Sequence, residues 1–199
     1  LFSLSLGVQG FVGCTPPIGV KRVSPEEAYQ IATRSPLSGD ENSNAAMAVI
    51  QRFDLVGLYQ RDPGAALHQL HQHALNDDRR DLLFALAELN YSWAKTLPPR
   101  PEAKSGKPSA ADVYLQSAVY AYLYLLGDGK EPLPNAYDNR FREACELYNR
   151  GLDQAFRSPN GDALHFEDRL RTLPEFRLAI DVQTDELRWQ LTDFEKLEP

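Results

Sequence analysis

The sequence carries its strongest pattern in RRDLLFALAELNYSWAKTL (residues 79–97) and AADVYLQSAVYAYLYLLG (residues 110–127). In both stretches apolar residues recur at the spacing of an α-helix. They include Leu82, Leu83, Ala85, Leu86, Leu89 and Trp93 in the first stretch, and Val113, Leu115, Val119, Tyr122, Leu123 and Leu126 in the second. Both helices are apolar on more than one narrow face, so we expect other elements to cover them on several sides, in the middle of a helical stack.

Further helices are predicted on either side of this central pair. Their signals are Ser24-Pro25, a start near Ser43, Asp62-Pro63 ahead of Gly64–Leu75, and the periodic stretch at about Ala136–Arg157. Serine, aspartate and proline are common at helix N-termini, and Ser24, Ser43 and Ser109 are predicted to act as caps. The proline-rich Leu97–Ser109 is expected to be an exposed loop. The fold class is therefore mainly α, with five or six helices in antiparallel hairpins.

The character of the chain changes after Gly161. Apolar residues alternate in ALHFEDRL (residues 163–170) and in EFRLAIDV (residues 175–182), which indicates short strands. Residues 161–199 are accordingly predicted to be a β-containing C-terminal segment. They are either the start of a further domain or a hairpin that packs on the helical domain of residues 24–160.

The first 23 residues resemble an export signal followed by a tether. Leu1–Gly13 is apolar, is too short to span a membrane and has the length of a signal-peptide core. It lacks an initiating Met and a basic segment, so we expect the chain to begin inside a longer one. Phe11-Val12-Gly13 before Cys14 resembles a lipobox, in which small residues expose the bond before a cysteine that receives lipid. The alternatives are a free cysteine or a short buried strand.

Lipidation at Cys14 implies the membrane as a partner. Attachment through two or more acyl chains is durable, whereas a single chain binds reversibly. Thr15 stands where aspartate commonly signals inner-membrane retention, which favours the outer membrane facing the periplasm. Residues 15–23 contain Pro16, Pro17 and Gly19 and should form an extended tether.

Composition excludes several classes of protein. The 199 residues are 43% hydrophobic, which fits a folded domain. Lys plus Arg number 21 against 28 Asp plus Glu, a net charge of −7 without a basic stripe, so no nucleic-acid partner is expected. The two cysteines do not indicate a disulfide framework, and Cys145 is predicted to be a small buried apolar residue.

Candidate chemistry is sparse. His68, His71 and His73 lie on one predicted helix, but the HExxH pattern is missing, so a solvated helix face is favoured over a metal site. The nucleophile elbow, the P-loop and the dinucleotide fingerprint are also missing. No catalytic, cofactor-binding or metal residue is therefore assigned. The tyrosine set Tyr114, Tyr120, Tyr122 and Tyr124 is interpreted as core and interface, with a ligand groove as the alternative.

Four stretches follow one another in an order that a known family shares. They are Gly13-Cys14-Thr15-Pro16 with Gly19-Val20 and Val23 behind it, RRDLLFALAEL (79–89), AVYAY (118–122) and ACELYNRGL (144–152). This order resembles the N-terminal region of bacterial lipoprotein-type α/β-hydrolases. The chain departs from the family pattern at Phe11 and in the long loop 97–109. Residues 83–91 and 118–122 also resemble tetratricopeptide helices, although the loop is too long for a 34-residue repeat.

The resemblance implies a non-catalytic helical region that supports or covers a downstream α/β-hydrolase domain. None of the family's catalytic residues can be assigned here, because no position in the chain matches them. A free-standing tetratricopeptide-like interaction lipoprotein is the alternative. A Gly-x-Ser-x-Gly elbow in the reading frame after Pro199 would favour the first hypothesis, and a stop codon would favour the second.

Overall fold

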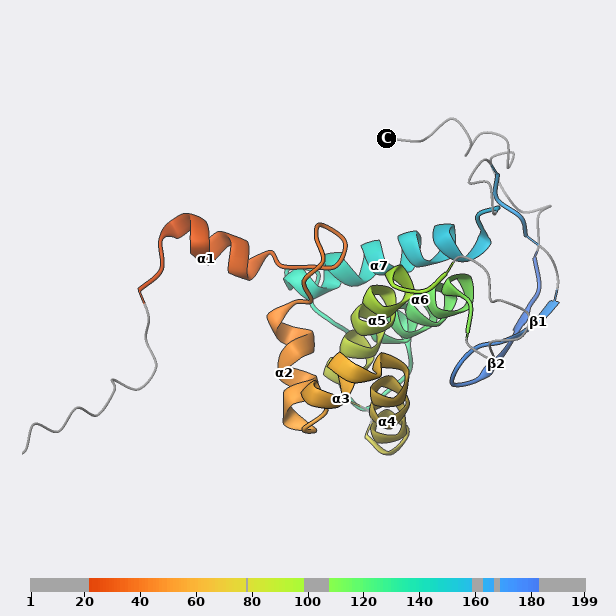
Figure 1. The fold of residues 1–199 in the computed structure, drawn as a ribbon, viewed down its shortest axis with the longest axis horizontal. Coiled ribbons are helices and arrows are strands. Elements are labelled where there is room, and N and C mark those ends of the chain that lie inside the picture. Colours follow the sequence, from red (N-terminus) through yellow and green to blue (C-terminus); the bar gives the residue numbers. More distant parts are fainter. Residues whose placement is uncertain (1–21, 78, 99–107, 159–162, 167–168, 183–199) are drawn as a thin grey trace, which may run out of the picture.

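A computed structural model describes residues 22–77, 79–98, 108–158, 163–166 and 169–182, and these are mainly helical (Figure 1). The helices are α1 Pro25–Ala32, α2 Asn44–Arg52, α3 Val56–Arg61, α4 Pro63–Asn76, α5 Arg80–Lys95, α6 Ala110–Leu126 and α7 Asn139–Phe156. Strands β1 Arg169–Thr172 and β2 Arg177–Ile180 form a two-stranded antiparallel sheet. The prediction of a mainly α chain with a short β-containing tail is confirmed.

The described part of the chain contains seven helices, against the five or six predicted, because one predicted helix is divided into α2 and α3. The division lies at Asp54, whose φ of 55° is left-handed. The Leu55 N–H donates to the Ile50 carbonyl at 2.9 Å, and the Asp54 N–H donates to the Gln51 carbonyl at 3.1 Å. This pair of bonds is a Schellman motif, which ends α2 and turns the chain into α3.

The central pair lies in the middle of the helical body, as predicted. Helix α5 contacts α2, α4, α6 and α7, and α6 packs between α5 and α7. The main core comes from α2, α4, α5, α6 and α7 and includes Ile50, Leu67, Leu70, Leu82, Leu86, Leu89, Ala121 and Leu147. Gly151 lets α7 approach α6 closely, since a Cβ there would lie 3.0 Å from the Tyr114 carbonyl oxygen and 3.1 Å from the Ala118 Cβ.

The predicted helix caps are confirmed. The hydroxyl oxygens of Ser24, Ser43 and Ser109 accept N–H bonds at the starts of α1, α2 and α6. Asp62 caps α4 in the same way, with Pro63 in the first turn. Residues 99–107 of the proline-rich loop lie outside the described part, but its two ends are adjacent, because the Ala110 N–H donates to the Pro98 carbonyl at 3.3 Å.

The β1–β2 hairpin packs against α6 and α7, with Leu173, Phe176, Leu178 and Ile180 among the contacting side chains. The Arg171 guanidinium fixes it there: it donates to Asp112 Oδ1 at 2.6 Å and to the Ala155 carbonyl at 3.1 Å. The second predicted strand is confirmed. The first was placed wrongly around Leu164 and Phe166: β1 begins at Arg169, and Leu164 makes only an isolated bridge with Arg157.

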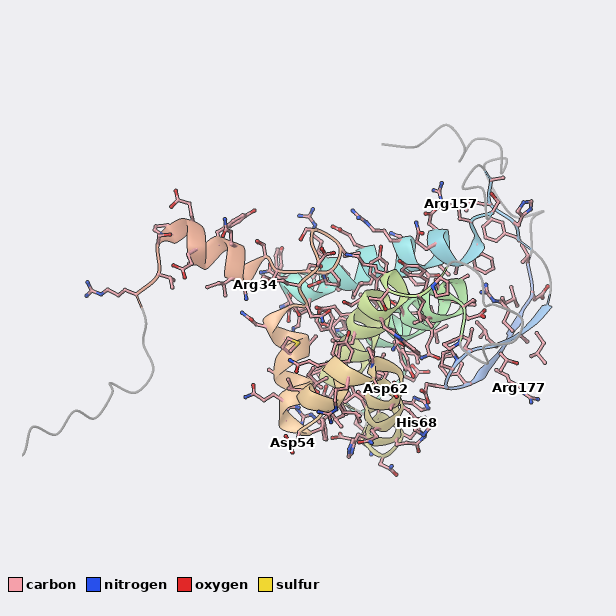
Figure 2. The ribbon with its side chains drawn as sticks, viewed as in Figure 1. Arg34, Asp54, Asp62, His68, Arg157 and Arg177 are labelled. Carbon is pink, nitrogen blue, oxygen red and sulfur yellow. The ribbon has the colours of Figure 1, made fainter. Side chains whose placement is uncertain are left out.

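Helix α1 projects from one side of the helical body, whereas the hairpin lies at the other side (Figure 1). The residues between α1 and α2, Thr33–Ser43, return the chain to α5 and α7. Arg34, which is labelled in Figure 2, marks where α1 ends and this return begins. The position of α1 therefore depends on how these residues are held.

Candidate functional site

The three histidines of α4 have three different partners. His68 Nδ1 lies 2.8 Å from Glu175 Oε2 at the hairpin turn, and His71 Nδ1 lies 2.8 Å from the Tyr120 hydroxyl on α6. The His73 ring stacks on Phe53, with centroids 4.3 Å apart. Within the described ranges, no group of three or more His, Cys, Asp or Glu side chains could hold a metal ion.

The prediction of a solvated histidine face is correct for His68 and His73, which are exposed, and wrong for His71. His71 is half-buried because the rings of Tyr120 and Phe176 lie beside it, with centroids 6.1 and 6.4 Å away. Burial lowers the pKa of His71, and the nearby Glu175 carboxylate partly offsets this. Since Phe176 belongs to the hairpin, helical periodicity alone could not reveal this contact.

A chain of hydrogen bonds between amide groups positions the Glu175 carboxylate beside His68, which is labelled in Figure 2. The Glu175 N–H donates to Gln116 Oε1 at 3.0 Å, Gln116 Nε2 donates to Asn90 Oδ1 at 3.0 Å, and Asn90 Nδ2 donates to the Leu86 carbonyl at 2.7 Å. The Glu175 side chain is only 5% exposed, whereas that of His68 is 59% exposed. The imidazoles of His68 and His71 thus face a carboxylate and a phenol.

The four tyrosines of α6 are divided between core and surface. Tyr120 and Tyr124 are buried, Tyr114 is half-buried against Tyr91 with centroids 5.0 Å apart, and Tyr122 is 47% exposed. Burial raises the pKa of Tyr114 to about 12, so its phenol stays neutral. The prediction of a core role is confirmed for Tyr120 and Tyr124, and the interface role stays a prediction.

The end of α6 and the loop after it carry large exposed apolar side chains. We call this group the α6-end surface: Tyr122, Leu123, Leu126, Leu133 and Tyr137, which are between 36% and 96% exposed. Tyr122 and Leu126 are four residues apart and share one helical face. Exposed apolar side chains that gather in one place, in contrast to scattered ones, mark interaction sites.

Arg80 holds the loop beside the end of α6. Its guanidinium donates to the Tyr124 carbonyl at 2.6 Å, to the Gly127 carbonyl at 2.9 Å and to the Pro132 carbonyl at 2.8 Å. These bonds satisfy carbonyls that the end of a helix leaves unpaired. Arg80 therefore places the loop that carries Leu133 next to Leu126 and Leu123. Sequence reasoning missed this residue, because a buried arginine in the first turn of a helix has no local signature.

Glu88 is a second buried charged residue of α5, with an exposed fraction of 0%. Its carboxyl accepts the N–H of Ser43 and lies 2.6 Å from the Ser43 hydroxyl oxygen, so it completes the N-terminal cap of α2 from another helix. Burial raises the pKa of Glu88 to about 8, and Glu143 on α7 adds to this increase. Glu88 was predicted only as a member of a helix.

The two cysteines lie in different parts of the chain. Cys14, the predicted lipidation site, lies outside the described residues, as does the apolar run before it. Cys145 is half-buried beside Phe141 and Ala144, so the prediction of a buried apolar residue was too strong. Among the helices that the structure describes, none is both long and apolar enough to cross a bilayer.

Comparison with known proteins identifies no relative. No protein-family model matches the chain, no curated protein matches it, and no solved structure matches it.

Proposed function

We propose that this chain is a non-catalytic helical unit that supports or covers another protein domain, and that its α6-end surface is the contact. The exposed apolar side chains of this surface carry the proposal. Interfaces between proteins are enriched in tyrosine at their buried centres. Tyr122 and Tyr137 would lose most of their exposed area on docking, and their hydroxyls could bond to the partner.

The buried polar side chains support a structural role. Arg80 and Arg171 donate to carbonyls at the ends of α6 and α7, and Glu88 completes the cap of α2. Arg80 and Glu88 each join α5 to another helix, and Arg171 joins the hairpin to α6 and α7. Among the described residues, these buried charged side chains thus hold elements of the fold together, which is what a structural support requires.

The family resemblance extends the proposal. We infer that the domain it serves is an α/β-hydrolase, that the helices are tetratricopeptide-like, and that a lipid at Cys14 holds the protein at the outer membrane. The alternative is a free-standing interaction lipoprotein, whose partner at the same surface would be a separate protein. Both forms of the proposal use the same apolar contact.

Hydrogen exchange measured by mass spectrometry on the complete gene product and on residues 22–199 tests the contact. We expect amides of residues 122–126 and 131–137 to exchange about tenfold or more slowly in the complete product, because docking excludes water from them. Leu126→Gln should remove this protection. The control is Leu75→Gln, since Leu75 is 64% exposed near the end of α4 and Leu126 is 61% exposed at the end of α6.

Equal exchange in the two proteins, in a gene that encodes a domain beyond Pro199, would exclude the support role. If the gene ends at Pro199, the surface should gain protection only when a separate partner is added. A loss of protection in Leu75→Gln as large as in Leu126→Gln would show that the effect is general destabilisation and not a contact.

A further inference from the structure

The linker between α1 and α2, residues 33–43, lies across α5 and α7. The N–H groups of Ser38 and Gly39 both donate to the Ser35 carbonyl at 3.1 Å, which forms a compact turn. Pro36 is buried in this turn, and Leu37 packs against the main core. Since α1 projects from the body (Figure 1), the attachments of this linker set where α1 lies.

Two cations hold one side of the linker. Lys95 Nζ donates to the Gly39 carbonyl at 2.7 Å, to the Pro36 carbonyl at 3.2 Å and to Asp40 Oδ1 at 3.0 Å. Arg150 on α7 donates to the Leu37 carbonyl at 3.3 Å. Lys95 and Arg150 therefore fasten the linker mainly through its backbone carbonyls.

Two carboxyl groups lie on the other side. Glu88 on α5 bonds to the N–H and the hydroxyl of Ser43 at the end of the linker. Glu143 on α7 lies near Ser35 at its beginning, and Glu143 Oε1 is buried without a hydrogen-bond partner among the described residues. In that same part of the chain, no Lys, Arg or His forms an ion pair with either carboxyl.

A buried carboxyl without a cation is more stable when protonated. The groups that face this pair do not reverse that preference. Glu143 and Glu88 oppose each other's ionisation, Glu146 on α7 opposes that of Glu143, and the half-buried Tyr59 phenol on α3 is neutral. The bonds from Ser43 and the nearby Ser35 favour the ionised forms, but burial outweighs them, and the pKa values of Glu88 and Glu143 are both raised.

We propose that the linker is a pH-sensitive latch, which Glu88 holds against α5 through Ser43 while Glu143 lies buried beside its other end, and which loosens as these carboxyls ionise. A linker that opens exposes both carboxyls to water, where they ionise at ordinary carboxyl values. Closing therefore takes up protons, and the latch is strongest at low pH. It weakens as the pH rises from about 4.5 toward 8, by at most about tenfold per pH unit for each group.

Hydrogen exchange of the full chain between pH 6 and 9, corrected for the intrinsic rate at each pH, tests the latch. We expect the protection of residues 35–43 to fall about tenfold or more between pH 6 and 8, while that of α6 stays constant. Glu88→Gln should make linker protection nearly independent of pH, because the amide can bond to Ser43 but cannot ionise. Glu143→Gln should flatten the profile in part.

Glu41→Gln is the matched control. Glu41 is an acid of the linker itself, but its side chain is 69% exposed and pairs with Arg34, so the variant should keep the wild-type profile. A linker whose protection does not change with pH, or a Glu88→Gln variant that keeps the wild-type profile, would overturn the latch. If Glu88→Gln does not fold, ¹³C NMR titration of wild-type glutamate carboxyls decides: one should titrate near pH 8, and none above pH 6 would contradict the proposal.

Discussion

Arg80 and Glu88 lie two turns apart on α5, and both are buried charged residues with different kinds of hydrogen-bond partner. The Arg80 guanidinium donates to carbonyls at the end of α6 and in the following loop. Glu88 is fully buried with hydroxyl and amide partners only, and its pKa rises to about 8. Arginine cannot lose its proton in a protein, whereas a carboxyl can gain one. The first residue is therefore a fixed clamp and the second can respond to pH.

His71 offers a pH test at the scale of one side chain. Its pKa is lowered by burial, so the fold favours the neutral imidazole and the unfolded chain binds the proton more readily. The stability from burying neutral His71 is present above about pH 6.5 and is lost as the pH falls below that value. His71→Asn keeps a group that can bond to Tyr120 but does not titrate there.

Thermal melts from pH 7.5 to 5 should show this difference. Acidification should lower the melting temperature of the wild type more than that of His71→Asn, by about 1–3 °C, since water screens a half-exposed ring. His73→Asn on the same helix is the control and should follow the wild type at every pH. If the His71→Asn and wild-type curves stay parallel, the imidazole is not held neutral by the fold.

At the scale of elements, the starts of helices were easier to predict than the break between α2 and α3. Ser24, Ser43, Ser109 and Asp62 cap the helices for which they were predicted, because capping depends on residues within one turn. The break at Asp54 was missed, because aspartate takes a left-handed conformation less often than glycine or asparagine and the apolar pattern continues through it.

Strand β1 was misplaced for a related reason. Its outward-facing Leu170 is 64% exposed, whereas its inward-facing Arg171 is 6% exposed, so the usual order of apolar and charged positions is reversed. Arg171 can face inward because Asp112 and the Ala155 carbonyl accept hydrogen bonds from its guanidinium and the Phe156 ring lies under it. These partners are distant in sequence, so alternation alone predicted the strand around Phe166.

The α2–α3 junction gives a prediction about backbone conformation. Asp54, labelled in Figure 2, has a φ of 55°, which glycine adopts without the steric cost of a Cβ. Asp54→Gly should therefore raise the free energy of unfolding by about 0.5–1 kcal/mol, after the greater freedom of glycine in the unfolded chain is subtracted. Asp54→Ala should lower it by about 1 kcal/mol, since alanine has the Cβ and no polar group to bond locally.

Chemical denaturation of the three proteins measures both changes. Leu75→Ala is a useful reference, because its side chain is exposed and the substitution should stay within about 0.5 kcal/mol of the wild type. If Asp54→Gly is less stable than the wild type, the aspartate side chain makes a contact worth more than the strain. If Asp54→Gly is less stable than Asp54→Ala, residue 54 does not need a left-handed backbone and the junction is not a simple Schellman end.

At the scale of the whole molecule, three features have separate places. The α1 arm and its linker lie on one side, the hairpin lies on the other, and the α6-end surface follows the end of the central helix (Figure 1). The sequence could predict that tyrosines of α6 belong to the core, because they lie on an apolar helix, and Tyr120 and Tyr124 do so. It could not predict which of them stay exposed, since this depends on where α7 and the hairpin pack.

The proposed anchor precedes this body in the chain, so it predicts where the whole protein is found. The complete gene, with its native start, should be expressed in a bacterial host, and membrane and soluble fractions should be compared for wild type, Cys14→Ser and Cys145→Ser. The wild type should enter the membrane fraction, because two or more acyl chains on Cys14 would hold it durably. Cys14→Ser should move to the soluble fraction or keep an uncleaved signal, which a mass measurement distinguishes.

Cys145→Ser separates lipidation from a general effect of losing a thiol. Cys145 is the free cysteine of α7, half-buried beside Phe141, and its substitution should leave the protein in the membrane fraction. Mass spectrometry of the wild type should also show acyl chains on the peptide that begins at Cys14. If wild type and Cys14→Ser have the same distribution and the same unmodified mass, the resemblance to a lipobox is accidental and Cys14 carries no lipid.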